Sequence, residues 1–333
     1  MINIKEFAKL ANVSQSTISK ALNDRPDVSP ETKSKIIELA KKYDFVPNAF
    51  GKGLKSHTTE NIGVIFCREQ LPLSGNPFYS RVLEGIEAEL VLKNYNLVLH
   101  LIPESKQQVL PKMIRQRQVD GLILAGIFQE QFIQNILSHN ISVVLIDPKF
   151  ALNNCSQVLI DNEHGAFTAT EYLIQKGHRR IGFISGDLER LSFKQRFIGY
   201  KKALEYNSIP VDESLVQTGG NEKGYEHVKQ LLRLDNRPTA IFAVNDINAI
   251  HGYKAIQEQS LKIPDDISII GFDDIELAKY LTPALTTIRV YKEELGSIGV
   301  RMLLQMINGE NKTPATTIIP TRLVERDSVT GLK

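Results

Sequence analysis

The chain has 333 residues, a length that suits two or three domains rather than one core. Hydrophobic residues make up 42% of it, yet no apolar run approaches the roughly 18 residues of a membrane-spanning helix, so we expect no transmembrane segment. No apolar segment follows a basic start at the N-terminus, which argues against a secretory signal. Cys67 and Cys155 lie far apart without metal-site spacing, so we expect a protein of the reducing cytoplasm.

The net charge of +2 is unevenly distributed along the chain. Residues 1–60 hold ten Lys and Arg against seven Asp and Glu, a net charge of +3. The remaining residues hold thirty against thirty-one, a net charge of −1. The positive excess therefore lies in the N-terminal segment, where it favours a nucleic-acid partner.

Two short helices are expected in residues 3–23. Asn3 followed by Glu6 is a helix-start signature, and the residues after it have apolar side chains at helical spacing. Ser14 is placed to cap a second helix, in which Ile18 and Leu22 form a narrow apolar seam. The other face of that helix is polar and carries Gln15, Ser16, Thr17, Ser19 and Lys20. This pattern is typical of a helix-turn-helix, whose second helix presents polar side chains to base edges in the DNA major groove.

A third helix is predicted to begin at Pro30, with Ser29 as its N-cap, because proline loses nothing at the first helical position. Ile36, Ala40 and Tyr43 are expected to form its buried stripe. The segment 47–60 then reads as a linker.

From residue 61 onward, strand-like and helix-like segments alternate, which predicts an α/β fold with parallel sheets. Expected strands cover residues 62–66, 97–102, 121–125, 143–146 and 158–160, and a helix over 81–94 carries Val82, Ile86 and Leu90 on one face. The same order returns about 120 residues later at 181–185, 239–243 and 267–273. Two similar lobes are implied.

Ligands of open parallel sheets bind beyond the carboxyl ends of the strands, so two facing lobes predict a cleft between those ends. The candidate segments are the loop 71–79 and Asp147 in the first lobe, and the loop 186–196, residues 245–246 and residues 273–274 in the second. The predicted effector-binding side chains are Asn76, Phe78, Asp147, Arg190, Arg196, Asn245 and Asp273.

The chemistry of this set suits a sugar. Arg196 offers a fork of donors, Asp273 accepts from hydroxyls, and Phe78 or Tyr79 offers a face to a sugar ring. Structural alternatives remain open for several of these residues. Asp273 or Asp274 is also placed to cap the next helix, Arg190 to be a solvated loop charge, and Phe78 and Tyr79 to be core; Asp246 is expected to organise its lobe.

The N-terminal motifs resemble those of a known family. Residues 4–14 read IKEFAKLANVS and are followed by Ser16-Thr17-Ile18-Ser19, Leu22-Asn23 and Val28-Ser29. This order is similar to the head of the LacI/GalR family of bacterial repressors, and the resemblance continues through Val46-Pro47-Asn48-Ala49 to the C-terminus. It implies a helix-turn-helix head and a two-lobed core of the periplasmic-binding-protein type (type I). Arg196, Asn245 and Asp273 match positions that hold effector hydroxyls in the family.

The resemblance also implies a hinge that folds into a short helix on DNA and inserts Leu54 into the minor groove. Gly51 and Gly53 depart from the family pattern, and each weakens a helix by about 0.5–1 kcal/mol relative to alanine. We therefore expect a hinge helix that is marginal even on DNA; a plain flexible linker is the alternative. Lys20 also departs from the more usual arginine. The expected DNA-binding residues are Ser14, Gln15, Ser16, Thr17, Ser19, Lys20, Asn23, Asn48 and Leu54.

The expected organisation is a DNA-binding domain at 1–46, a hinge at 47–60 and an effector-binding core at 61–333. The first lobe takes about 61–160 and 291–319, and the second about 161–290 and 320–333. No nucleophile elbow, phosphate loop, dinucleotide fingerprint or metal-ligand spacing is found, so we expect neither an enzyme nor a metal or cofactor.

The sequence thus predicts a cytoplasmic homodimeric repressor of carbohydrate-utilisation genes, which binds near-palindromic operator DNA and responds to a sugar-like effector between the lobes. Two alternatives are a global catabolite regulator that uses a phosphoprotein co-repressor, and a free-standing sugar-binding protein. The second of these would lack residues 1–60.

Overall fold

The structure is a computed structural model that describes residues 2–22, 24–43, 45, 58–68, 73–220, 223–311 and 313–332. The chain divides into two units, residues 1–59 and residues 60–333, and each is described by itself. Asn23, Asn48, Gly51, Gly53 and Leu54 lie outside the described residues, so the predictions made for them stay predictions.

The first unit contains α1 (Ile4–Ala11), α2 (Gln15–Leu22) and α3 (Pro30–Lys42). Its small core consists of buried apolar side chains from all three helices and from the segments beside them, among them Phe7, Ile18, Ile36 and Phe45. The rings of Phe7 and Phe45 stack with centroids 4.0 Å apart. Each helix is too short to be stable in isolation, so this shared core holds the unit together.

The predicted caps of these helices are confirmed. Asn3 and Glu6 form a reciprocal capping box at the start of α1. The hydroxyl of Ser14 accepts from the backbone N–H of Thr17 at 3.0 Å, and that of Ser29 accepts from Thr32 at 3.3 Å. Each cap satisfies a backbone donor that the first turn leaves unpaired.

One prediction for α3 is wrong. Ile36 is buried, but the Tyr43 side chain keeps 42% of its surface exposed. The helix ends at Lys42, so Tyr43 leaves the helical spacing as the C-cap residue. Phe45, two residues later, takes the place in the core against Phe7.

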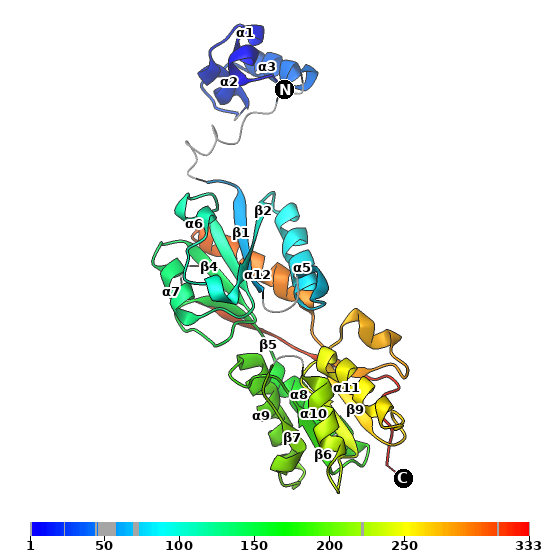
Figure 1. The fold of residues 1–333 in the computed structure, drawn as a ribbon. Coiled ribbons are helices and arrows are strands. Elements are labelled where there is room, and N and C mark those ends of the chain that lie inside the picture. The colour runs from blue at the N-terminus through cyan, green and yellow to red at the C-terminus, as the bar shows by residue number, and fades with distance from the viewer. Residues whose placement is uncertain are drawn as a thin grey trace. The chain divides into compact units, whose positions relative to one another are not determined.

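The second unit contains two six-stranded sheets (Figure 1). The first has the order β11-β5-β4-β3-β1-β2 with all neighbours parallel. Its strands are β1 (Asn61–Arg68), β2 (Asn96–Pro103), β3 (Gly121–Ala125), β4 (Ser142–Ile146), β5 (Ser156–Ile160) and β11 (Thr316–Ile319). We call this sheet with its helices the first lobe.

The second sheet has the order β12-β10-β9-β8-β6-β7 and is parallel except for β12, which runs antiparallel to β10. Its strands are β6 (Ile181–Ile184), β7 (Val216–Gln217), β8 (Ala240–Ala243), β9 (Ser268–Asp273), β10 (Thr286–Arg289) and β12 (Arg322–Val324). This sheet with its helices is the second lobe. Because β1, β3 and β4 hold the same places in their sheet as β6, β8 and β9, the predicted repeat and the predicted parallel α/β fold are confirmed.

Helices cover both faces of each sheet, which is why alternate strand residues belong to different cores. In the first lobe, α5 (Tyr79–Leu92) and α12 (Lys292–Ile307) pack on one face, and α6 (Lys112–Arg115) and α7 (Glu130–Leu137) on the other. In the second, α8 (Asn162–Gln175) and α9 (Leu191–Tyr206) cover one face. Its other face carries α10 (Gly224–Leu232) and α11 (Asp246–Glu258).

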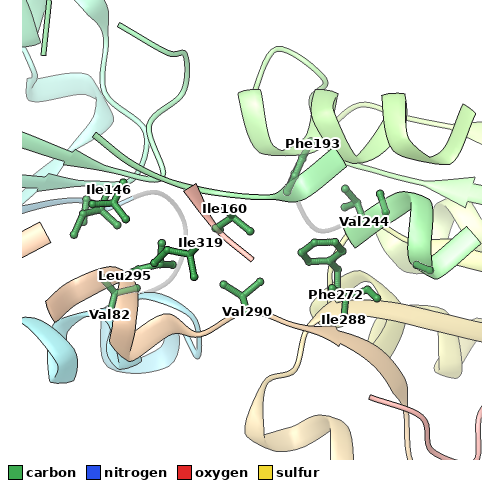
Figure 2. Packing of buried hydrophobic residues seen from close by; sticks show 14 of the residues in the cluster. Val82, Ile146, Ile160, Phe193, Val244, Phe272, Ile288, Val290, Leu295 and Ile319 are labelled. Carbon is green, nitrogen blue, oxygen red and sulfur yellow. The ribbon is translucent and has the colours of Figure 1, made fainter. Parts of the chain in front are cut away.

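The chain passes between the two lobes three times, after β5, after β10 and after β11. A buried aliphatic side chain lies at each passage, namely Ile160, Val290 and Ile319. Figure 2 shows these three between the apolar side chains of the first lobe, such as Ile146, and those of the second, such as Phe272. One apolar cluster therefore continues through the connection between the lobes.

Within the described part of the chain, no helix is both long enough and apolar enough to cross a membrane.

Candidate functional site

The polar face of α2 is the candidate DNA surface of the first unit. Gln15 and Ser16 are exposed, and Thr17, Ser19 and Lys20 are half-buried. The Ser14 hydroxyl lies 3.0 Å from that of Ser16 and 2.8 Å from that of Thr17. Ser14 thus has a definite structural task as the cap of α2, in addition to the DNA contact predicted for it.

Lys20 forms a salt bridge with Asp27, a residue of the segment between α2 and α3. The side chains of Lys20 and Asp27 are 40% and 51% exposed, and pairs with this much exposure contribute little to stability. The salt bridge lowers the pKa of the Asp27 carboxyl, chiefly through the hydrogen bond from Lys20. The ammonium group of Lys20 would have to leave Asp27 to reach a base or phosphate, which raises the cost of that contact.

The second unit contains a pocket between the strand ends of its two lobes. All seven side chains predicted to bind an effector line it: Asn76, Phe78, Asp147, Arg190, Arg196, Asn245 and Asp273. The first lobe also contributes Phe66, Leu73 and Tyr79, and the second Ser192, Phe193 and Asn248. The cavity volume of about 130 Å³ suits a small molecule. The structure therefore brings together what topology and resemblance had selected.

Arg196, on α9, is the most restrained charge in the pocket and is only 3% exposed. Its Nε donates to Asn162 Oδ1 at 2.9 Å, and its Nη1 donates to the carbonyl of Val244 at 2.7 Å. Its Nη2 lies 3.2 Å from Oδ1 of Asp273. The planar guanidinium also lies over the ring of Phe272, 3.7 Å from its centroid. Four groups thus fix the orientation of its fork of donors.

Asp273 ends β9 with φ of +109°, a backbone conformation that a residue with a side chain adopts only under strain. The strand end holds this geometry through the Lys292 ammonium, which donates to the Asp273 carbonyl. Burial raises the pKa of the Asp273 carboxyl, and the nearby charge of Arg196 opposes that rise. Strain and a buried carboxylate at one residue are typical of a site that binds a ligand.

Asn245 caps α11 from the position directly before the helix. Its Oδ1 accepts from the backbone N–H of Asn248 at 2.9 Å and from Asn248 Nδ2 at 2.7 Å. The cap therefore engages the side-chain oxygen of Asn245, and the N–H donors of its side-chain amide point to a role in binding a ligand.

In the first lobe, Asn76 accepts from the backbone N–H groups of Phe78 and Tyr79, at 3.1 and 3.0 Å, and so restrains the start of α5. The Tyr79 hydroxyl donates to Asp147 Oδ2 at 3.0 Å. Desolvation raises the pKa of Asp147 to about 6, although Arg196 and Tyr79 favour its ionised form. Asp147 therefore titrates close to the physiological range.

Three predictions about neighbouring residues can be compared with these contacts. The expectation that Asp273 or Asp274 caps the following helix is wrong, because the N-cap residue is Ile275. The Asp274 carboxylate accepts from Arg289 and Arg326 instead, each at 2.6 Å, and that of Asp273 faces Arg196. Asp246 organises the lobe as expected, accepting from the backbone N–H of Ile275 and from the Thr287 hydroxyl. The Arg190 guanidinium lies 5.3 Å from the centroid of the Phe193 ring, a contact that a fully solvated loop charge would not make.

Asn248, Ser192 and Phe193 line the same pocket but were not among the predicted side chains, although Ser192 and Phe193 lie in the candidate loop 186–196. Asn248 lies three residues after Asn245, and that spacing places both side chains on one side of the first helical turn. The spacing was therefore a usable signal. Among the described residues, no group of three His, Cys, Asp or Glu side chains is placed to hold a metal ion.

A helix-turn-helix unit suited to the DNA major groove, followed by a two-lobed α/β core with a polar cleft, indicates a class of protein, the ligand-responsive transcription regulators. Residues 3–48 match the family described as bacterial regulatory proteins, lacI family, and residues 170–329 match the periplasmic binding protein-like domain. The chain belongs to the LacI family and is a transcriptional repressor rather than an enzyme.

Three relatives illustrate the similarity. The ribose operon repressor of Haemophilus influenzae is 35% identical over 100% of both chains. The transcriptional repressor PurR of Photorhabdus laumondii is 36% identical over 99% of this chain and 97% of its own. A LacI family regulator from Enterococcus faecium, solved with bound ribose, is 30% identical over 82% of this chain and 100% of its own, with a TM-score of 0.72. The resemblance found in the sequence is thereby confirmed.

Proposed function

We propose that this repressor binds a small sugar in the cleft of its core and that the sugar controls its binding to the operator of carbohydrate-utilisation genes. In this proposal the polar face of α2 reads base edges in the major groove, and the protein acts in the cytoplasm. One recognition helix covers about half a site, so a homodimer on a near-palindromic operator supplies the affinity and specificity.

The observation that carries the sugar assignment is the set of polar groups around Arg196. The guanidinium presents fixed donors, and the carboxylates of Asp273 and Asp147 reach the cleft from different lobes. Vicinal hydroxyls both donate and accept, so they match such a mixture of carboxylate and guanidinium groups. Phe78 and Phe193 add apolar surface for the ring of the sugar. The ribose-bound structure of a relative supports the same class of ligand.

A purine base is the second candidate, because the name of the relative PurR points to purines. The aromatic side chains of the cleft would suit a flat base. However, a base offers few hydrogen-bond donors, whereas the cleft offers the acceptors of two carboxylates. This balance favours the sugar.

Control of DNA binding follows from the position of the pocket. Side chains of both lobes line it, so a bound sugar stabilises one separation of the lobes over others. The lobes also touch at its rim, where the backbone N–H of Leu191 donates to the carbonyl of Lys149 at 2.8 Å. We propose that closing and opening at this rim changes the spacing of the two DNA-binding units in the dimer.

Exposed apolar side chains on the core support a homodimer. Val91 and Leu92 at the end of α5 are 61% and 75% exposed, and Leu277 and Tyr280 in the second lobe are 54% and 69% exposed. Exposed apolar side chains of this size favour contact with a partner. Sedimentation of the full chain at micromolar concentration tests the dimer.

Calorimetry of the full-length protein with D-ribose, D-glucose, cellobiose and adenine tests the effector class. We expect at least one sugar to bind and adenine not to. The Asp273→Asn variant keeps the shape of the site but loses the charge, and we expect it to lose the sugar heat. Binding of adenine alone would overturn the sugar assignment in favour of the purine.

A further inference from the structure

Asn248 lies in the first turn of α11, is only 1% exposed and lines the pocket. Buried polar side chains are normally fully hydrogen-bonded, so each exception calls for a physical reason. The Oδ1 atom of Asn248 is such an exception, since it has no hydrogen-bond partner among the described residues.

The neighbouring contacts determine which atom of the Asn248 amide is the oxygen. The backbone N–H of Asn248 is a donor only, so the atom of Asn245 that it contacts at 2.9 Å must be an oxygen. The Asn248 side-chain atom 2.7 Å from that same oxygen must then be the amide nitrogen. Rotating the Asn248 amide would place two oxygens against each other. The unpartnered atom is therefore an acceptor.

A second acceptor in the same pocket has a similar need. Asp273 Oδ1 is buried and makes no hydrogen bond of good geometry, although Arg196 Nη2 lies 3.2 Å away. Leaving an acceptor buried without a donor costs free energy, which a ligand hydroxyl returns when it donates. Two such acceptors in one small cavity call for a ligand with at least two donors.

We propose that Asn248 Oδ1 accepts a hydrogen bond from one hydroxyl of the effector and so determines which sugars the repressor accepts. This inference rests on the proposed function and extends it. Asn245 acts on Asn248 as a positioning residue, because its Oδ1 holds the Asn248 amide with the oxygen free for the ligand. A site built to bind a hydroxyl rejects the analogue that lacks it.

The test compares wild type with Asn248→Leu, which is similar in size but has no acceptor. Calorimetry on the full-length proteins measures the affinity for D-ribose and D-glucose and for each monodeoxy analogue of these sugars. For wild type, we expect one deoxy position to weaken binding about tenfold or more. For Asn248→Leu, the sugar and its deoxy analogue at that position should bind about equally well, whereas the losses at the other positions should persist.

Two controls separate this role from a structural one. Thermal unfolding and DNA binding without sugar report whether Asn248→Leu is folded. The Ile250→Leu variant changes a residue of the same helix that packs against the core and does not line the pocket, and its dependence on each hydroxyl should equal that of wild type. If Asn248→Leu folds, binds sugar and keeps every deoxy ratio of wild type, the inference is overturned while the proposed function stands. If wild type binds none of the sugars, both are overturned.

Discussion

The two lobes share a fold but restrain their pocket side chains very differently. In the second lobe, Arg196 is held by Asn162, by the carbonyl of Val244 and by Asp273. Beside it, Asp274 accepts from two arginines. In the first lobe, the corresponding polar group is Asp147, which directly follows β4 and accepts a hydrogen bond from the Tyr79 hydroxyl.

This difference indicates how the two lobes divide the work of binding. A side chain fixed by several buried partners pays little conformational entropy when a ligand arrives, so the second lobe is preorganised. In the first lobe, the Asp147 carboxylate accepts a hydrogen bond from Tyr79, and we expect this pair to adjust more readily than Arg196 when the lobes close. Truncating the buried, ion-paired Arg196 of the second lobe should therefore lower stability and sugar binding together, whereas substitutions of Asp147 and Tyr79 in the first lobe should act chiefly on binding.

The largest effect is expected for Arg196→Ala. Removing the guanidinium leaves the buried carboxylate of Asp273 without its opposite charge, and breaking a buried pair in this way costs about 3–5 kcal/mol. Urea unfolding should show this loss of the free energy of unfolding, and calorimetry should show no sugar binding. The exposed Arg233 provides the matched control, since Arg233→Ala should change neither quantity. Equal stability of the two variants would contradict the preorganised second lobe.

The second-largest effect is expected for Asp274→Ala, which should lower the free energy of unfolding by about 3 kcal/mol. The loss is smaller than for Arg196→Ala because Arg289 is partly exposed and regains water when its partner is removed. Burial alone would raise the pKa of Asp274, but the hydrogen bonds from Arg326 and Arg289 outweigh it and lower the pKa. The stabilisation is therefore present at neutral pH and lost as the pH falls through the lowered pKa. Urea unfolding at pH 7 and in acid should show the difference between wild type and variant shrinking. A difference that grows in acid would exclude this ion-pair explanation.

A moderate effect is expected from pH on sugar affinity. Desolvation raises the pKa of Asp147 to about 6. The carboxyl group is therefore mostly ionised above this pKa, at about pH 7.5, and mostly protonated below it, at about pH 5. If the ionised form accepts from the sugar, affinity should fall by up to about tenfold per pH unit below the pKa. Calorimetry from acid to neutral pH on wild type and Asp147→Asn measures this.

The sign for folding is the opposite. The folded pKa of Asp147 lies above the unfolded value, so this group favours the folded state below the unfolded pKa, and that contribution is lost as the pH rises through about 6. Burial also raises the pKa of the neighbouring carboxyl of Asp273. The Asp147→Asn variant therefore shows whether the pH dependence of sugar affinity comes from Asp147 or from Asp273. A pH step that persists in Asp147→Asn would belong to another carboxyl.

The smallest effect is expected for Tyr79→Phe, which removes the hydrogen bond to Asp147 and keeps the ring against Phe66. The loss of one hydrogen bond should weaken sugar binding by about 0.5–1.5 kcal/mol without changing the free energy of unfolding beyond that range. The bond also favours ionised Asp147, so its removal should shift the pH step of affinity upward. An unchanged pH profile would show that Tyr79 does not act on Asp147.

Much of the architecture was predictable from the sequence. The spacing of apolar residues indicates helices and strands locally, and the order of these elements indicates parallel sheets. The bounds predicted for β3 match the structure, and the strand ends led to all seven predicted pocket residues. Other features depend on tertiary contacts that no local pattern reports. Strands β10, β11 and β12 are short, and β10 and β11 begin with two threonines rather than an apolar run.

Two individual errors have the same origin. Tyr43 matches the helical spacing of α3, but the helix ends one residue earlier and Phe45 fills the core. Asp274 has the sequence context of a helix cap, yet Arg289 and Arg326 reach it from β10 and from beyond β12. In both cases the deciding residue, Phe45 for the first and the two arginines for the second, lies outside the local pattern on which the prediction was based.

The most direct measurement of the central claim is DNA affinity with and without sugar, on an operator selected from random duplexes by the full-length protein. Fluorescence anisotropy would follow wild type and Asp273→Asn, using the sugar that binds best in calorimetry. We expect the sugar to change the affinity of wild type for this operator by tenfold or more and to leave Asp273→Asn unchanged, with both proteins binding equally in its absence. Equal DNA affinity of wild type with and without saturating sugar would contradict the account.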